Sequence, residues 1–465
     1  MIYAEGTRVR SGREEAIKAV SEIARLIEPT LGPAGSDVLI TTPFGEVFTT
    51  NDGATVMREV PIEHPAARIA ADIALTQETL VGDGTTSTVV LASNLLTELA
   101  PLIEEHGLRN VLEGLSRAQR LIEGIIEDET RPLEEDDLPR IVTTTLAGKA
   151  GEEHAPLIAQ LLIASLTDAQ AHIAYARTIG PVMSESHRFE GILIDAHRVR
   201  DDMPRRVTNP RILLVSGALE AHTPSGISIS SAEEAERFFV SERNASTSIA
   251  RTIIESGATL VVCRKGIDDT IQHELSQAGI VAVRRIPLET LETISQASGA
   301  VILPTLEGIT TALGRAASAR DTKRGVLIEG VDASTIVICG STEHVADELM
   351  RAAHDAEGVI RSAREDPVGV GGALVIEARA SRIDDGPIER AVGRAFENLV
   401  RTMTTTMPRE GRGFDIRTGR EVDAWKEGII EPAQVKRVCV ANAFEIARII
   451  LRIETIVNLP ERSSR

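Results

Sequence analysis

Apolar residues near the start of the chain recur with the period of an α-helix. Within residues 13–28 they form one stripe that consists of Ala16, Ile17, Val20, Ile23, Ala24 and Ile27. The Gly- and Pro-containing turn at 31–35 ends this helix. Two short apolar runs, at 37–40 and 46–49, then predict a β-hairpin.

Helical patterning follows from residue 53 to about residue 175, and one of these helices begins at the Gly-rich stretch 82–87. From about 191 to 340 short apolar runs alternate with helical stretches. This alternation indicates a sheet covered by helices. The predicted strands lie at 191–194, 212–215, 259–263, 280–283, 300–303, 326–328 and 335–339.

Helical sequence returns from residue 342, is interrupted at 368–372 and ends with a helix at about 432–454. The simplest architecture therefore inserts an α/β domain into a helical domain that both ends of the chain build. The segment 219–250 is polar and rich in serine, and it interrupts the β/α alternation. We interpret it as an excursion from the inserted domain.

Composition and charge exclude several classes of protein. The 465 residues are 42% hydrophobic and 26% charged, which indicates a globular chain of about three domains. Aromatic residues make up 2% and the net charge is −19, which argues against a nucleic-acid partner. No apolar run approaches the ~18 residues that cross a bilayer, and the first residues lack an apolar signal core. We expect a soluble, cytoplasmic protein without a membrane partner.

The cysteines and lysines bear on the cellular environment. Cys263, Cys339 and Cys439 are far apart and predict buried thiols of a reducing compartment. Only six of the 50 basic residues are lysines. Few lysines and a large acid excess suggest, as a hypothesis, a salt-rich cytoplasm such as that of a halophilic archaeon, although codon bias explains them equally well. Folding and assembly that are unchanged between low and molar salt would contradict the salt hypothesis.

Residues 82–87, Gly-Asp-Gly-Thr-Thr-Ser, carry the strongest sign of chemistry. Glycines allow close approach of the backbone to a ligand, and the start of the following helix offers free N–H groups to a phosphate. Asp83 can hold Mg²⁺, and the hydroxyls of Thr85, Thr86 and Ser87 can donate to phosphate oxygens. The alternative is an ordinary helix start with Asp or Thr as N-cap, which is favoured when the motif is taken alone.

Two further turns are candidates for the same site. Residues 30–35 can form a second phosphate-facing turn, and residues 51–53, Asn-Asp-Gly, can position a water or a metal. Taken alone, the first is better explained as a helix C-cap and the second as a turn with an Asx hydrogen bond. The chain has no GxxxxGK[ST] motif, no supported GxGxxG fingerprint and no HExxH spacing, so P-loop, Rossmann and zinc sites are unsupported.

Seven segments, taken together and in order, resemble the group II chaperonins, the family of the archaeal thermosome and the eukaryotic cytosolic chaperonin TCP-1. The segments are TLGPAGSDVLI, TNDGATVMREVPIEHPAARI, VGDGTTSTVVLASNLL, CRKGIDDTIQHELSQAGIVAVRRI, GSTEHVADE, GFDIRTGREVDAWKEGIIEPAQVK and ILRIETIV. Each is weak to moderate by itself, but their order and spacing make coincidence improbable. The chain resembles a divergent and shortened member.

The resemblance implies a multidomain α and α/β fold. It comprises a helical equatorial domain, an intermediate domain and an inserted α/β apical domain, whose helical protrusion serves as a lid over substrate. Carried onto this sequence, the boundaries are 1–136 and 373–465 for the equatorial domain, 137–190 and 341–372 for the intermediate domain, and 191–340 for the apical domain with its lid at 219–250.

The resemblance also implies an ATP site with Mg²⁺. Asp83 matches the Mg²⁺ ligand, Asp52 a carboxylate beside the γ-phosphate and Asp355 the residue that activates the attacking water. The remaining implied contacts hold the phosphates, sense the γ-phosphate or touch the ribose. They are Thr30, Leu31, Gly32, Pro33, Gly84, Thr85, Thr86, Ser87, Lys149, Gly371, Gly372 and Glu431.

The implied activity is ATP-dependent folding of unfolded client proteins inside a double ring of identical or related subunits. Asp355 is far along the chain from Asp83, so we expect domain closure to bring it into the site and to couple hydrolysis to conformation. The alternative is a non-hydrolysing paralogue that serves as a structural ring partner or client-binding scaffold. A third possibility is an unrelated NTPase, which would be a monomer.

Departures from the family pattern motivate the alternative. Val370 stands at the first position of a glycine run, Ala34 replaces a lysine, and Val375 replaces an acidic residue. The stretch between Ala391 and Phe414 is short. We therefore expect the helix and Asn-Ala-Gly turn that wall the nucleotide pocket in the family to be missing.

Overall fold

The computed structural model describes residues 8–42, 45, 47–149, 154–166, 171–180, 183–221 and 232–458. The chain divides into two compact units. One, which we call the terminal unit, comprises Met1–Ile163 and Asp347–Arg465, and the other, the inserted unit, comprises Ala164–Ala346. Both ends of the chain thus build one unit and the middle builds the other, as the hydrophobic pattern predicts. The finer division into three domains stays a prediction.

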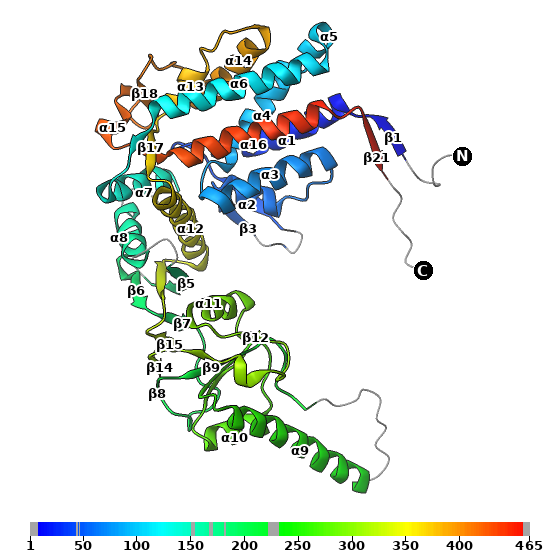
Figure 1. Cartoon of the computed structure of the whole chain (residues 1–465), viewed down its shortest axis with the longest axis vertical. Coiled ribbons are helices and arrows are strands. Elements are labelled where there is room, and N and C mark those ends of the chain that lie inside the picture. Colours follow the sequence, from blue (N-terminus) through cyan, green and yellow to red (C-terminus); the bar gives the residue numbers. More distant parts are fainter. Residues whose placement is uncertain are drawn as a thin grey trace. The chain divides into compact units, whose positions relative to one another are not determined.

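Helices dominate the terminal unit, and Figure 1 shows the long ones side by side. They are α1 (Arg13–Ile27), α2 (Gly53–Glu59), α3 (Pro65–Val81), α4 (Thr85–Leu99), α5 (Leu102–His106), α6 (Leu108–Glu129), α7 (Leu138–Leu146), α13 (Val375–Ala380), α14 (Pro387–Met403), α15 (Ala424–Glu427) and α16 (Ala433–Leu451). Two more, α8 (Ala155–Ser165) and α12 (Glu343–Glu365), lie mostly in this unit and run across its boundaries.

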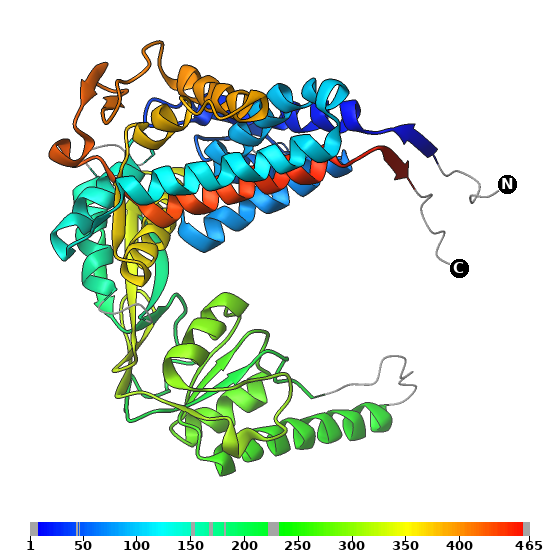
Figure 2. The ribbon, with the colours of Figure 1, turned by 45° about the horizontal axis from the view of Figure 1, so that its top comes forward.

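The core of the terminal unit is almost entirely aliphatic, as the low aromatic content requires. Its centre is α4, which packs against α1, α14 and α16, while α6 lies along α14 and α16 (Figure 2). Two of the few aromatic side chains, Phe396 on α14 and Phe444 on α16, are fully buried there among Leu, Ile, Val and Ala. This packing fixes the start of α4, which is the element that the sequence singles out for chemistry.

Short antiparallel sheets border the helices of the terminal unit. In one of them β17 lies between β4 and β20, where the sequence indicates only a break between helices. The strands are β1 (Arg8–Ser11) with β21 (Thr455–Asn458), β2 (Val38–Thr41) with β3 (Val47–Thr50), β18 (Gly413–Asp415) with β19 (Arg420–Val422), and β4 (Arg131–Pro132), β17 (Val368–Gly371) and β20 (Ile430–Pro432). The predicted hairpin is confirmed as β2–β3.

The inserted unit confirms the predicted β/α alternation. A mainly parallel sheet has the order β11-β10-β9-β12, and helices α9, α10 and α11 connect its successive strands. Its elements are β9 (Arg211–Val215), α9 (Ala232–Ser256), β10 (Leu260–Cys263), α10 (Asp269–Gln277), β11 (Val281–Val283), α11 (Leu288–Ser298), β12 (Ile302–Leu303) and β13 (Gly314–Arg315), which pairs with β9.

Two further sheets complete the inserted unit. One has the order β7-β15-β14-β8, formed by β7 (Ile192–Ile194), β8 (Arg206–Thr208), β14 (Ser318–Asp321) and β15 (Val326–Glu329). The other has the order β5-β16-β6, formed by β5 (His172–Ile179), β6 (His187–Glu190) and β16 (Ala333–Gly340). The mixed α/β architecture with several sheets agrees with the expected fold class.

One prediction of secondary structure is wrong and one is tested only in part. Helix does not continue to residue 175, because α8 ends at Ser165 and β5 begins at His172. All eight residues of β5 pair in parallel with β16. Pairing with a strand about 160 positions later therefore determines that this segment forms a strand and not a helix. Of the predicted lid, residues 222–231 lie outside the described residues, and those after them belong to α9.

Candidate functional site

A cavity in the terminal unit collects nearly all of the predicted site residues. It lies where the start of α4, the starts of α2 and α16, the end of α3 and one face of α12 come together. Its lining includes Thr30, Leu31, Gly32, Pro33, Asp52, Asp83, Gly84, Thr85, Thr86, Ser87, Lys149, Asp355 and Glu431. Gly371 and Gly372 stand behind the lining at the end of β17, and Gly372 packs against the Glu431 carboxylate.

The N-terminus of α4 opens onto this cavity without a side-chain cap. Gly84, at φ 88° in the left-handed region, is the N-cap residue, and no side chain there accepts from the first-turn N–H groups. Asp83 Oδ1 instead accepts from the Gly84 N–H at 2.8 Å. The alternative of an ordinary Asp or Thr cap is therefore not what forms. A helix of 15 residues with open N–H groups suits an anion such as a phosphate.

Asp52 combines a structural role with a place in the cavity. It is the N-cap of α2, and its carboxylate accepts from the N–H groups of Ala54 and Thr55 and from the Thr55 hydroxyl at 2.6 Å. Burial raises the pKa of Asp52, but the nearby charge of Lys149 and the Thr55 and Ala54 hydrogen bonds outweigh it, so the pKa lies below its usual range. Asp52 is ionised at neutral pH.

Lys149 holds two carboxylates that come from distant parts of the chain. Its Nζ lies 2.7 Å from Asp355 Oδ2 and 3.3 Å from Asp83 Oδ1. The side chains of Asp355, Lys149 and Asp83 are 8%, 22% and 32% exposed. Asp355 therefore already lies in the cavity in this conformation, within the same compact unit as Asp83. The expectation that only closure brings it there was wrong, because distance along the chain is no measure of distance in the fold.

The carboxylates and the lysine shift one another's proton affinity. Burial raises the pKa of Asp355 to about 7, with Lys149 opposing the rise and Asp52 and Asp83 adding to it. Burial lowers the pKa of Lys149, but the charges of Asp355, Asp83 and Asp52 outweigh burial, so its pKa is raised and the ammonium stays charged. A buried carboxylate that titrates near neutral pH suits a general base.

A second buried ion cluster lies on another side of the cavity. Lys436, in the first turn of α16, contacts Glu377 at 2.7 Å and Glu431 at 3.1 Å. Burial raises the pKa of Glu431, with Lys436 opposing and Glu377 and Asp83 adding to the rise. Sequence reasoning missed Lys436 and Glu377. The signal for Lys436 was the segment GIIEPAQVK, which contains it. The signal for Glu377 was its place two positions after Val375, the position at which the family pattern has an acidic residue.

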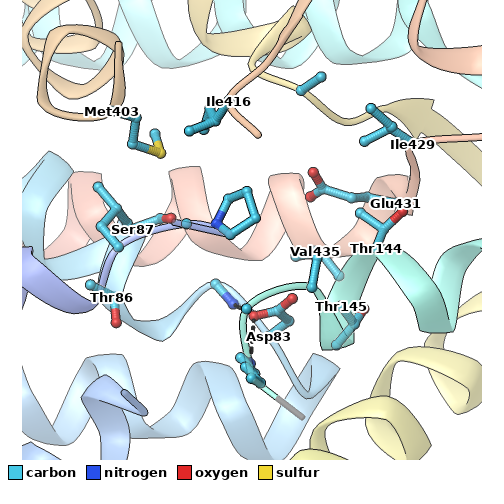
Figure 3. A pocket seen from close by; sticks show the side chains of 18 of the residues that line it. Asp83, Thr86, Ser87, Thr144, Thr145, Met403, Ile416, Ile429, Glu431 and Val435 are labelled. Carbon is cyan, nitrogen blue, oxygen red and sulfur yellow. Dashed lines mark hydrogen bonds and ion pairs between the residues drawn. The ribbon is translucent and has the colours of Figure 1, made fainter. Parts of the chain in front are cut away.

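Apolar side chains line the cavity on the side opposite Asp83. Figure 3 shows Met403, Ile416 and Ile429 across the cavity from Asp83 and Thr86. Met403 is the last residue of α14, and Ile416 follows β18 directly. Of these three, only Met403 belongs to the short stretch between Ala391 and Phe414, and the absence there of the family's helix and Asn-Ala-Gly turn stays a prediction. Sequence reasoning did not identify these three residues.

The residues present fit a magnesium–phosphate ligand. Across the described parts of the chain no group of three or more His, Cys, Asp or Glu side chains is arranged to hold a metal. Mg²⁺ commonly takes one or two protein carboxylates and completes its shell with phosphate oxygens and water. Asp83, beside the open start of α4, is the carboxylate placed for that role.

Among the described helices none has the length and apolarity of a membrane span.

Removing Lys149 tests whether the ion cluster is as tightly coupled as its geometry indicates. Lys149→Met leaves Asp355 buried without its cation, and we expect the terminal unit to lose about 3 kcal/mol of stability at pH 8.5. The loss should shrink toward pH 6, because the pKa of Asp355 rises further without Lys149 and the neutral acid is cheaper to bury. Melting curves across this pH range measure the effect. Lys426, whose side chain is 82% exposed, gives the control variant Lys426→Met. A loss of stability in Lys149→Met that is equal at both pH values would contradict the coupling.

Comparison with known proteins gives the site its context. A model of the TCP-1/cpn60 chaperonin family matches residues 23–383. A thermosome subunit of Methanopyrus kandleri is 33% identical over all of this chain and 95% of that protein. Thermosome subunit beta of Methanothermobacter thermautotrophicus is 31% identical, and thermosome subunit alpha of Archaeoglobus fulgidus is 32% identical. Both alignments cover 98% of this chain and 94% of the relative.

The likeness seen in seven short segments thus extends along the chain. The family model covers well over half of the residues, and three thermosome subunits exceed 30% identity across nearly their full lengths. Insertion of an α/β unit into a helical unit is also the arrangement that the resemblance implies. On these grounds the chain belongs to the TCP-1/cpn60 chaperonin family, as a divergent member of its group II, thermosome-type branch.

Proposed function

We propose that this chain is a subunit of an ATP-dependent molecular chaperone that acts in the cytoplasm. In this proposal it binds unfolded proteins and folds them inside a double ring closed by a built-in lid. The observation that carries the proposal is the meeting of Asp52, Asp83, Lys149 and Asp355 at the uncapped start of α4. A scaffold without nucleotide chemistry has no need to gather four charged groups around the buried Asp355, because withdrawing charge from water is costly.

Each charged group has a distinct task in this proposal. The N–H groups at the start of α4 and the hydroxyls of Thr85, Thr86 and Ser87 hold phosphate oxygens. Asp83 would hold Mg²⁺, which would supply positive charge beside the phosphate oxygens. Lys149 is placed to contact the γ-phosphate, while Asp52 lies on the same side of the cavity. Asp355 orients water and accepts its proton.

The remaining lining residues suit the rest of a nucleotide. Glu431 is placed to accept from ribose hydroxyls, and Lys436, 3.1 Å away, opposes the rise that burial causes in the pKa of this carboxyl group. Met403, Ile416 and Ile429 offer an apolar surface of the kind that covers a purine face. The backbone at Gly371 and Gly372 keeps the Glu431 side of the cavity close to β17.

Assembly into rings is supported by the relatives and by exposed sheet edges. The printed names of the relatives call them thermosome subunits, including alpha and beta forms. In this chain β1–β21 and β2–β3 are two-stranded sheets. Such small sheets are marginal in isolation, and their free edges can pair with another chain. We propose ring neighbours that are identical or related chains.

Refolding of a denatured client tests the function as a whole. With Mg-ATP the purified chain should restore activity to a denatured enzyme in proportion to hydrolysis, and with a non-hydrolysable analogue it should only hold the client. Negative-stain images of the same sample should show double rings. A non-hydrolysing scaffold would suppress aggregation equally with and without nucleotide, and an unrelated monomeric NTPase would show no rings. Either result overturns the proposal.

A further inference from the structure

The loop before α4 and the middle of α12 touch each other through bare backbone. A Cβ built on Gly358 would lie 2.7 Å from Gly82 Cα and 3.0 Å from Gly82 N. A Cβ built on Gly82 would lie 2.4 Å from the Asp355 carbonyl oxygen and 2.8 Å from Gly358 Cα. Carbon atoms of side chains do not approach backbone this closely. The contact therefore exists only because both positions are glycine.

The contact between Gly82 and Gly358 lies next to the charged cluster of Asp83, Lys149 and Asp355. Asp83 follows Gly82 directly, and Asp355 precedes Gly358 by three positions, which places Asp355 and Gly358 on one face of α12. Lys149 joins the two aspartates at 3.3 Å and 2.7 Å. The separation between Asp83 and Asp355 is thus set at the point where the two glycines meet.

Near its two ends α12 also makes polar contacts through long side chains. Near its start Glu348 accepts from the Thr50 hydroxyl at 3.0 Å, and near its end Arg364 contacts Glu135 at 3.2 Å. These flexible side chains tolerate a small shift of the helix axis, whereas the glycine contact does not. Glycine is also among the least favourable residues inside a helix, so its presence at 358 calls for a packing reason.

We infer that Gly358 is a positioning residue for Asp355. By letting α12 touch Gly82, it places the Asp355 carboxylate within reach of Lys149 and of the water that the proposed hydrolysis uses. A methyl group at 358 needs about 0.7 Å or more of extra room to reach ordinary contact, and a displacement of about 1 Å can cost ~100-fold in rate. The kinetic part of this inference rests on the proposed function, but the structural part does not.

Gly358→Ala and the matched variant Gly124→Ala separate positioning from helix propensity. Gly124 lies inside α6, and a Cβ there meets nothing within 4 Å. We expect Gly358→Ala to lower kcat per bound nucleotide about 10- to 100-fold while the Kd for Mg-ATP changes less than about threefold. Gly124→Ala should keep both values and raise the melting temperature slightly, because it gains helix propensity without a clash.

Lengthening the carboxylate supplies a readout that a merely structural role would not move. Asp355→Glu in the Gly358→Ala background adds one methylene and should recover part of kcat, although Asp355→Glu alone lowers it. Crystal structures of the nucleotide-free variants give a measurement that needs no activity. In Gly358→Ala the Nζ–Oδ2 contact between Lys149 and Asp355 should exceed 4 Å, and in Gly124→Ala it should persist.

The outcomes distinguish this inference from the proposed function. An intact Lys149–Asp355 contact in folded Gly358→Ala overturns the inference, whatever the kinetics. Wild-type chain that binds no nucleotide overturns the proposed function, and the crystallographic contact then still decides the role of Gly358. If Gly358→Ala folds poorly, the kinetic values are taken per bound nucleotide, and absence of rescue by Asp355→Glu overturns the inference.

Discussion

Asp355→Asn is expected to lower the rate of ATP hydrolysis by about 10²- to 10⁴-fold, the range that a general base contributes. The amide keeps the size of the side chain but cannot accept a proton from water. Lys149 and Asp83 remain, so Mg-ATP should still bind within a few-fold of the wild-type Kd. Single-turnover hydrolysis and calorimetric binding on the same preparation measure the two effects separately.

The pH profile of the wild-type chain gives the same prediction a second readout. With a pKa of about 7, the ionised fraction of Asp355 rises from about a tenth at pH 6 to about nine-tenths at pH 8. Because the base works only when ionised, kcat/KM, which reports the pKa of the nucleotide-free chain, should rise about tenfold over this range, and the residual rate of Asp355→Asn should stay flat. The control is Asp347→Asn, on α12 but outside the cavity lining. Equal hydrolysis by wild type and Asp355→Asn would contradict the assignment.

The second large effect is expected at Asp83. Asp83→Asn removes the carboxylate placed for Mg²⁺, so hydrolysis should fall at least ~100-fold, and Mg²⁺ should no longer strengthen ATP binding. Loss of the negative charge also frees Lys149 from its 3.3 Å contact, while its 2.7 Å contact with Asp355 remains. Titrations of ATP with and without Mg²⁺ separate metal binding from phosphate binding.

Asp72→Asn is the matched control for Asp83→Asn. Asp72 lies on α3, the helix that precedes the Gly82–Ser87 stretch, and its side chain is exposed and outside the cavity lining. It should leave both binding and hydrolysis unchanged. If ATP binding by Asp83→Asn still depends on Mg²⁺, the assignment of Asp83 as the metal ligand is wrong and another carboxylate holds the metal.

Local features of the site are the part that the sequence predicts well. The helix start at the Gly-rich stretch 82–87 is predicted correctly, but the motif taken alone favours an Asp or Thr cap, and the structure has Gly84 at the N-cap with no side-chain cap. The Asx turn at Asp52 follows equally from its own neighbours, and the structure shows that it serves as a cap while facing the cavity. For Asp52 the structural interpretation is confirmed, and its role beside a phosphate stays a prediction.

Features that depend on distant segments were accessible only through the family resemblance or not at all. The pairing of Lys149 with Asp355 joins residues 206 positions apart, and no periodicity signals it. The strand at His172–Ile179 needs β16 as its partner, so its helical interpretation failed. The closeness of Gly82 to Gly358 depends on how closely α12 packs against the loop before α4. Composition and residue spacing do not predict that distance. The buried Lys436–Glu377 pair has the same character.

Uptake of Mg-ATP by the folded chain is the most direct test of the central claim. Calorimetry should show saturable binding of one nucleotide per chain that requires Mg²⁺. The chain's single Trp should report it independently, because Trp425 on α15 lies two residues before the cavity-lining segment 427–429. Folded chain that gives neither heat nor a fluorescence change, in low or molar salt, would contradict the account.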